Sequence, residues 1–386
     1  MTRIAYTGAR IFDGTQFWER SALVVDGGRI EGIVAADSPI NATRVPLAGG
    51  ILAPGFIDLQ VNGGGGALFN LTPDVSTITT ICSAFARFGT TATLPTLITD
   101  TPEKNRLAVA AGIAAAEQQV PGFLGLHIEG PHLAVSRKGA HDPALIRPME
   151  EVDLLALVEA RQRLPNLLIT VAAETVPPEQ IRRLTEAGIV VSIGHSDAPY
   201  PMVRAAVEAG ASMVTHLFNA QSQLGNRDGG VVGAALDLGA VWAGVIADGI
   251  HVSEVSLGIA LRAKRGPGQI FLVTDAMSPT GTDAESFVLT GQTVYRKNGA
   301  LRLADGTLAG ADLTMIQAIT YMHNTIGLPL EETLRMASLY PAQALGVAHE
   351  RGALSPGLRA DLVHLSEGLE VLSTVIGGTT AWSAPH

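Results

Sequence analysis

The residues best suited to chemistry are histidines and acids at the ends of short apolar runs. Glu129 ends the first of these runs, His195 and His216 end two later ones, and Asp275 ends the fourth. Each run has the length and β-branched content of a buried parallel strand. Four such endings on separate strands indicate one site built where strands converge, which is how a (β/α)8 barrel forms an active site.

These residue types are suited to metal-assisted hydrolysis. A catalytic zinc ion normally takes three protein ligands from His, Asp and Glu and keeps one position for water, and Glu129, His195 and His216 could supply that set. Bound metal lowers the pKa of its water toward about 7. Asp275 could take the proton and deliver it to a leaving amine. Either histidine alone would be read as an ordinary buried histidine, but the combination predicts a metal-dependent hydrolase of amide-like bonds.

Eight strand-like runs alternate with helical patterns along the middle of the chain and could position these side chains. Unbroken apolar strands joined by helices favour a parallel sheet covered on both faces, and eight βα units favour a closed barrel. The glycines at 63–66 lack the spacing of a dinucleotide-binding loop and are read as a flexible loop near the site. The candidate strands are 51–60, 89–98, 123–129, 166–174, 189–195, 212–217, 241–248 and 270–275, and the candidate helices include 101–118, 178–188, 198–210 and 253–264.

Both ends of the chain alternate in short β-like runs separated by Gly, Asp and Pro turns. The runs at 3–6, 21–25 and 29–34 and those at 360–365 and 370–376 predict one small domain assembled from both termini. The predicted fold class is therefore α/β, a (β/α)8 TIM-like barrel over 51–345 with a small β-sandwich-like domain over 1–50 and 346–386.

Composition narrows the functional classes. The 386 residues carry a net charge of −10, which argues against binding to nucleic acid or to an anionic membrane. The 47% hydrophobic content indicates a large core, yet no run is long enough to span a membrane. The single cysteine, Cys82, and an N-terminal segment without an apolar signal core lead us to expect a cytoplasmic protein.

Motifs spread over most of the chain resemble the amidohydrolase superfamily and, within it, the N-acetylglucosamine-6-phosphate deacetylases. They include Leu-His-Ile-Glu-Gly-Pro at 126–131, Gly-His-Ser-Asp at 194–197 and Thr-His-Leu-Phe-Asn-Ala at 215–220. Further matches lie at 54–58, 248–252, 273–277 and 305–310, in the family's order. The resemblance implies hydrolysis of the acetamide of N-acetylglucosamine 6-phosphate to glucosamine 6-phosphate and acetate.

The resemblance also implies roles for individual residues. One divalent metal ion per subunit would be held by Glu129, His195 and His216. Asp275 would act as general base and acid, and His141 would polarise the acetyl carbonyl. Zinc suits these ligands, and iron, cobalt or manganese would fit similar ones.

A second group of residues is implied to hold the sugar phosphate. These are Asn219, the Ala220 backbone, Arg227 and His251, and in the family the arginine comes from the neighbouring subunit. We therefore expect a homodimer in which Arg227 reaches the neighbouring active site. From the residues alone, Arg227 in its glycine-rich loop would be read as a solvated charge.

The chain departs from the wider superfamily at the end of the first strand. Many amidohydrolases have His-x-His there, which helps to bind a second metal, whereas this chain has Gln60 and Asn62. Amide side chains are poor zinc ligands beside imidazole. We therefore expect a single metal and assign Gln60 and Asn62 to substrate binding. Gln221 stands where the family often has Met.

Three rival functions remain open at this stage. The first is deacetylation of N-acetylgalactosamine 6-phosphate, because the choice of epimer depends on contacts to one hydroxyl. The second is another N-acyl amine substrate of the superfamily, such as a cyclic amide or an N-acyl amino acid. The third is a catalytically silent barrel kept as a binding protein, against which the complete set of predicted ligands argues.

Overall fold

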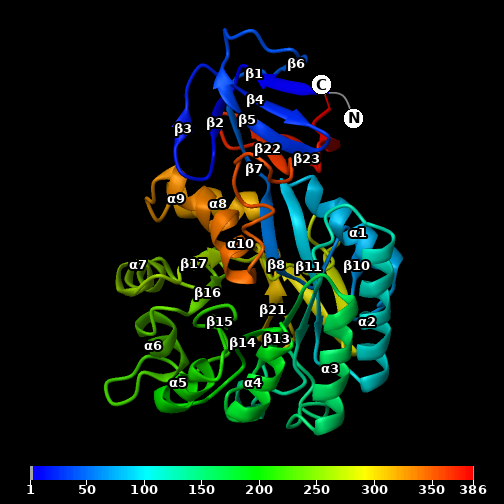
Figure 1. Cartoon of the computed structure of the whole chain (residues 1–386). Coiled ribbons are helices and arrows are strands. Elements are labelled where there is room, and N and C mark those ends of the chain that lie inside the picture. The colour runs from blue at the N-terminus through cyan, green and yellow to red at the C-terminus, as the bar shows by residue number, and fades with distance from the viewer. Residues whose placement is uncertain (1–2, 386) are drawn as a thin grey trace.

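A barrel of eight parallel strands lies at the centre of the computed structural model, which describes residues 3–385 (Figure 1). The strands follow one another in chain order around the sheet, so the predicted (β/α)8 fold is confirmed. The first and eighth strands close the ring just beyond the regular pairing, where Ala276 bridges to Val61 and the Asp275 N–H donates to the Gln60 carbonyl at 3.0 Å. The strands are β8 (Phe56–Val61), β11 (Thr90–Ile98), β12 (Leu126–Glu129), β13 (Leu167–Val171), β14 (Val190–Ile193), β15 (Met213–Val214), β16 (Trp242–Val245) and β17 (Ile270–Leu272).

Helices cover the outside of the barrel in the connections between strands (Figure 1). The N-terminus of α2 shows why the sequence predicted it, because the Thr101 hydroxyl accepts from the Lys104 N–H and Pro102 occupies the first turn. Within residues 3–385, no helix combines the length and apolar character needed to cross a membrane. The helices are α1 (Val75–Ala86), α2 (Pro102–Glu117), α3 (Glu151–Arg163), α4 (Pro178–Glu186), α5 (Tyr200–Glu208), α6 (Gly230–Asp237), α7 (Glu254–Ala263), α8 (Met315–Asn324), α9 (Leu330–Ala337) and α10 (Leu339–Leu345).

Strands from the two ends of the chain form two further sheets beside the barrel (blue and red in Figure 1). Between them lies a separate apolar core that includes Ile11, Leu23, Ile30 and Leu362, so the expected sandwich-like arrangement is confirmed. The four-stranded sheet has the order β5 (Arg29–Ala35), β4 (Ser21–Asp26), β1 (Ile4–Thr7) and β6 (Thr43–Pro46). The six-stranded sheet has the order β24 (Thr379–Ser383), β23 (Val371–Ile376), β22 (Leu362–Leu365), β7 (Ile51–Pro54), β2 (Arg10–Phe12) and β3 (Phe17–Trp18).

The expectation of one strand over 51–60 is wrong, because two strands lie there. Residues 51–54 form β7, which pairs with β2 and β22 of the terminal sheet, and β8 of the barrel begins only at Phe56. Gly55 separates them, and a side chain at this position would lie 2.2 Å from the Thr91 side chain. Both segments are apolar and buried, so composition alone could not show that they belong to different sheets.

A small antiparallel sheet follows the eighth barrel strand, in a region where the sequence predicted no element. It contains β18 (Ser286–Leu289), β19 (Gln292–Lys297), β20 (Ala300–Arg302) and β21 (Leu308–Ala311). The Arg296 side chain in β19 donates two hydrogen bonds to the carboxylate of Asp312, which directly follows β21, at 2.6 and 3.0 Å. The glycines at 63–66, expected as a flexible loop, form a short hairpin of β9 (Gly63–Gly64) and β10 (Ala67–Leu68).

Candidate metal and substrate site

The four strand-end residues singled out by the sequence meet at the carboxyl end of the barrel. Glu129 is the last residue of β12, whereas His195, His216 and Asp275 follow β14, β15 and β17 within three residues. These three have φ angles of +47°, +26° and +51°, in the left-handed region that is costly for residues with a side chain. Such strain costs on the order of 1–3 kcal/mol per residue and tends to cluster at functional sites.

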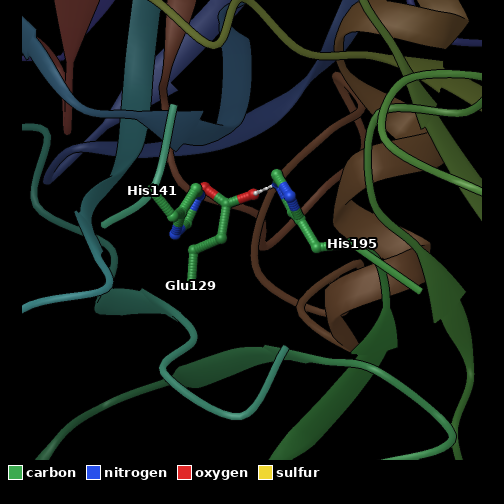
Figure 2. A group of neighbouring side chains, drawn as sticks. All are labelled: Glu129, His141 and His195. Atoms are coloured by element: carbon green, nitrogen blue, oxygen red, sulfur yellow. Dashed lines mark hydrogen bonds and ion pairs between the residues drawn. The ribbon is translucent and has the colours of Figure 1, made fainter. Parts of the chain in front are cut away.

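Three donor atoms crowd together at this point. Glu129 Oε1 lies 3.2 Å from His195 Nε2 and 3.0 Å from His216 Nε2, and the two Nε2 atoms are 3.1 Å apart. All three side chains are at least nine-tenths buried. Figure 2 shows Glu129 and His195 pointing toward one another, with the His141 ring beside them. Donor atoms that share one zinc ion at about 2.0–2.2 Å are separated by roughly this distance.

The hydrogen bonds behind the cluster also suit a cation. His195 Nδ1 lies 2.8 Å from the Arg137 carbonyl, which can only accept, so Nδ1 carries a proton and a neutral ring would direct its Nε2 lone pair toward the cluster. The buried Nδ1 of His216 has no such partner among the described residues. An Nε2 lone pair facing a carboxylate oxygen is unfavourable without a positive charge between them, so the residues present fit a bound metal ion.

Burial and hydrogen bonding set the protonation of the cluster. Burial alone would raise the pKa of Glu129, but its bonds to His195 and His216 outweigh burial and hold that pKa well below its usual range. Burial likewise opposes a charge on His216, yet the bond to Glu129 raises the pKa of this histidine. The cluster therefore holds a carboxylate anion that attracts positive charge, as a metal site requires.

Gln60 and Asn62 each hold one of the site's carboxylates. Gln60 Nε2 lies 3.2 Å from both carboxylate oxygens of Glu129, and Asn62 Nδ2 donates to Asp275 Oδ1 at 2.7 Å. Burial, followed by the nearby charge of Glu129, raises the pKa of Asp275 to about 6. A carboxyl group with a pKa near the working pH can both accept and return a proton.

His141 reaches the cluster from the loop that follows β12. Its Nδ1 lies 2.7 Å from the Thr99 hydroxyl, and its ring centroid is 4.4 Å from that of His195. A ring nitrogen of His141 lies within 4.8 Å of the ligand atoms of Glu129 and His195, so distance alone would admit it as a further metal ligand. Burial lowers the pKa of His141 to about 3, which keeps the ring neutral.

The metal cluster lines a pocket of about 310 Å³ that also contains most of the residues assigned to the sugar phosphate. Asn62, Asn219, Ala220 and His251 lie in its wall, while Gln60 lies behind it. His251 Nδ1 is 2.6 Å from the Asp248 carboxylate, which leaves Nε2 for the pocket. The small sheet inserted after the eighth strand also lines the pocket, through Leu289, Leu308 and Gly310 and through Thr307, which directly precedes β21.

Arg227 is placed elsewhere. It lies exposed in the loop between β15 and α6, and it is not among the described residues that line the pocket of its own chain. Gln221 is fully buried behind the wall, where its Nε2 donates to the Thr215 carbonyl. Neither position supplies a contact to the pocket within one chain.

Three supporting groups of the site were not predicted from the sequence. The Asp-Gly turn at Asp248 could have indicated a partner for His251, because its carboxylate also accepts from the His251 N–H at 2.8 Å. The Arg137 carbonyl could not be predicted from the sequence, because every residue has a backbone carbonyl. Thr99 directly follows an apolar strand that itself contains several threonines, and only the fold places it against His141.

Comparisons with known proteins agree with this site. The model of the amidohydrolase family, a family of metal-dependent hydrolases, matches residues 51–381. An N-acetylgalactosamine-6-phosphate deacetylase from a Shewanella species is 40% identical over 98% of this chain and 95% of its own length. An N-acetylglucosamine-6-phosphate deacetylase from Haemophilus influenzae is 36% identical over 92% of this chain and 93% of its own.

A solved structure gives the same result at the level of the fold. The N-acetylglucosamine-6-phosphate deacetylase of Pasteurella multocida superposes with a TM-score of 0.95 at 38% identity, covering 99% of this chain and 100% of that one. Near-complete coverage on both sides means that barrel, terminal domain and inserted sheet are shared. The chain belongs to the amidohydrolase family, in the group that contains these amino-sugar-phosphate deacetylases.

Proposed function

We propose that the protein hydrolyses the acetamide of N-acetylglucosamine 6-phosphate, giving glucosamine 6-phosphate and acetate. The observation that carries the proposal is the convergence of Glu129, His195 and His216 within 3.2 Å of one another, in one pocket with Asp275. Relatives of that activity at 36% and 38% identity support the choice of substrate.

Glu129, His195 and His216 would hold one divalent ion. When bound, such an ion polarises water and the amide oxygen as a Lewis acid. Gln60 orients Glu129, and the Arg137 carbonyl fixes the ring of His195. We propose zinc, because it suits one carboxylate and two imidazoles, although iron, cobalt or manganese would fit the same donors.

The remaining groups move protons and position the amide. Asp275 takes a proton from the attacking water, and Asn62 holds its Oδ1, so the proton goes to Oδ2. His141 donates from Nε2 to the acetyl oxygen as negative charge develops there. Asp275 then passes its proton to the nitrogen as the carbon–nitrogen bond breaks, so acetate and the free amine leave.

The phosphate would bind at the outer part of the pocket. His251 and Asn219 supply donors there, together with the backbone of Ala220. Arg227 is exposed and does not line the pocket of its own chain, which suits the proposal that it reaches the site of a second subunit in a homodimer. A cytoplasmic location also remains part of the proposal.

N-acetylgalactosamine 6-phosphate is the second candidate substrate. It is favoured by a specific observation, since the Shewanella relative of that activity shares 40% identity with this chain. The two sugars differ in the orientation of one hydroxyl, so both would place the acetamide against the same metal cluster.

Acetate release by the metal-replete protein tests the proposal, with the glucosamine and galactosamine 6-phosphate derivatives and free N-acetylglucosamine supplied in parallel. We expect turnover of at least one phosphorylated sugar and little of the free sugar. Failure on all three, with one metal ion bound per chain by elemental analysis, would reject the substrate and retain the metal site. Elemental analysis of protein purified without added metal tests the choice of zinc.

Arg227→Ala tests the shared site. It should raise KM for the phosphorylated sugar at least tenfold and leave the free sugar unaffected, whereas Arg106→Ala on the outer helix α2 should change neither. Mixing Arg227→Ala chains with inactive Asp275→Asn chains should restore the low KM for the phosphorylated sugar, because mixed dimers contain one site with both residues. A mixture whose KM stays as high as that of Arg227→Ala alone would contradict the exchange of Arg227 between subunits.

A further inference from the structure

We propose that Thr99 is a positioning residue that fixes the proton on Nε2 of His141, and so keeps this ring a hydrogen-bond donor and outside the coordination shell of the metal. The inference deepens the proposed function, in which His141 donates to the acetyl oxygen. It answers a question raised by the geometry, because His141 lies close enough to Glu129 and His195 to serve as a ligand.

Two groups of Thr99 face the same ring nitrogen. The Thr99 hydroxyl lies 2.7 Å from His141 Nδ1, and the Thr99 backbone N–H points at it from 3.4 Å. A backbone N–H can only donate. A proton on Nδ1 would face this donor, so Nδ1 must be the acceptor and the proton of the neutral ring lies on Nε2.

Among the residues that the structure describes, the hydroxyl has one other possible acceptor, the Glu129 carbonyl, at 3.5 Å. This contact is much longer than the one to His141, and Thr99 is only 1% exposed, so solvent hardly competes. Gly130 makes room for the arrangement, because a Cβ there would lie 2.2 Å from the Thr99 hydroxyl oxygen. The close approach of Thr99 to His141 therefore depends on a glycine beside the metal ligand Glu129.

The position of the proton decides what His141 can do. A protonated ring nitrogen has no lone pair for a metal, whereas it can donate to a carbonyl oxygen. If the proton moved to Nδ1, Nε2 would become a competent ligand beside Glu129 and His195. Thr99 thus determines whether His141 acts as a hydrogen-bond donor or as an additional metal ligand.

Thr99→Val tests the assignment because it keeps the shape of the side chain and removes the hydroxyl at 2.7 Å, which leaves His141 Nδ1 only the long and weak contact to the backbone N–H at 3.4 Å. Thr99→Ser restores the hydroxyl. Thr91→Val removes a buried hydroxyl near the beginning of β11, the strand that Thr99 follows, where Thr91 donates to the Phe56 carbonyl at 3.3 Å. Nitrogen NMR of ¹⁵N-histidine-labelled protein reads the tautomer, with the His141 resonances identified from their loss in His141→Gln. The absorption spectrum of the cobalt-loaded protein reports the number of ligands.

In the wild type we expect His141 to carry its proton on Nε2. Thr99→Val should shift His141 toward the Nδ1-protonated form, alter the cobalt spectrum, and lower kcat about tenfold, the worth of one hydrogen bond, with a smaller change in KM. Thr99→Ser and Thr91→Val should resemble the wild type.

An Nδ1-protonated His141 in the wild type, or a Thr99→Val protein with the wild-type tautomer and kcat, would overturn the inference. The NMR and cobalt measurements need no substrate. A protein that shows the expected tautomer but releases no acetate would refute the proposed function and leave the role of Thr99 intact.

Discussion

Two polar layers occupy the interior of the barrel, and they differ in how fully their groups are satisfied. One step back from the site, both ring nitrogens of His127 have partners, at 2.8 Å from the Thr170 hydroxyl and 3.3 Å from the Thr96 hydroxyl. The hydrogen-bonded chain continues from Thr170 to Thr215 at 2.7 Å and on to Ser192 at 2.6 Å. At the strand ends, by contrast, the buried atoms His216 Nδ1 and Asn62 Oδ1 have no partner among the described residues.

The backbone shows the same contrast. His127, Thr170 and Thr215 keep ordinary backbone angles, whereas His195, His216 and Asp275 all have positive φ angles. A fully paired layer stabilises the fold, while a strained layer with unpaired groups keeps its atoms available for a metal ion and a substrate. We call the strand-end residues Asn62, His195, His216 and Asp275 the outer layer, and the paired residues around His127 the inner layer. We expect substitutions in the outer layer to affect chemistry and those in the inner layer to affect stability.

Asp275→Asn should show the largest effect. The amide keeps the size of the side chain and cannot accept the proton of water, so kcat should fall by about a thousandfold. Metal content and the free energy of unfolding should change little, because Asp275 is not among the three crowded donors. Acetate release, elemental analysis and urea unfolding measure the three quantities.

Near-normal turnover of Asp275→Asn would remove this residue from the mechanism. A large loss of stability would instead show that the outer layer also holds the fold together, which would break the contrast between the layers.

His127→Leu should give the next largest effect, and on stability instead of chemistry. Burial lowers the pKa of His127 to about 4, so the ring is neutral and leucine removes no charge. The loss of two buried hydrogen bonds should lower the free energy of unfolding by about 2 kcal/mol. His127→Gln keeps a donor and an acceptor and serves as the control.

Urea unfolding of the metal-replete proteins measures this effect, and kcat of His127→Leu should stay within about threefold of the wild type. A variant that lost activity as severely as Asp275→Asn while remaining as stable as the wild type would show that His127 belongs to the chemistry.

The contrast between the layers also accounts for what the sequence could predict. The strand ends were visible because Glu129, His195 and Asp275 interrupt apolar runs, and polar residues that follow the strands of a barrel lie where its active site forms. The fold followed from the regular alternation of strands and helices. The hydroxyl network around His127 could not be predicted, because a threonine inside an apolar run fits a strand whether or not its hydroxyl is bonded.

The support of the site was hidden for a related reason. The Arg137 carbonyl and the Thr99 backbone act through groups that every residue carries, so only three-dimensional contacts distinguish them. The inserted sheet over 286–311 was not predicted because its strands are short and partly exposed. The separate strand at 51–54 was not predicted because its apolar residues continue into the barrel strand.

Asp58 gives the smallest and most specific test of the inner layer. It is fully buried, its Oδ1 accepts from the Thr274 N–H at 3.2 Å, and its Oδ2 accepts from the Thr274 hydroxyl at 2.5 Å. Burial outweighs these bonds and raises the pKa of Asp58 to about 7, against about 3.9 in an unfolded chain. Between these values the folded state binds the extra proton, so Asp58 makes the protein less stable as the pH rises.

Asp58→Asn removes that titration, because an amide does not ionise in this range. Between pH 5 and pH 6 the wild type should lose about 1 kcal/mol of unfolding free energy relative to the variant, since one pH unit corresponds to at most about 1.4 kcal/mol per proton. Urea unfolding of both metal-free proteins measures the difference. Both proteins contain the cluster of Glu129, His195 and His216, so its contribution to the pH dependence is the same in each and drops out of the comparison. If the two curves stay parallel, Asp58 is ionised in the folded protein at pH 5, and the inner layer contains a charge that its hydrogen bonds fully stabilise.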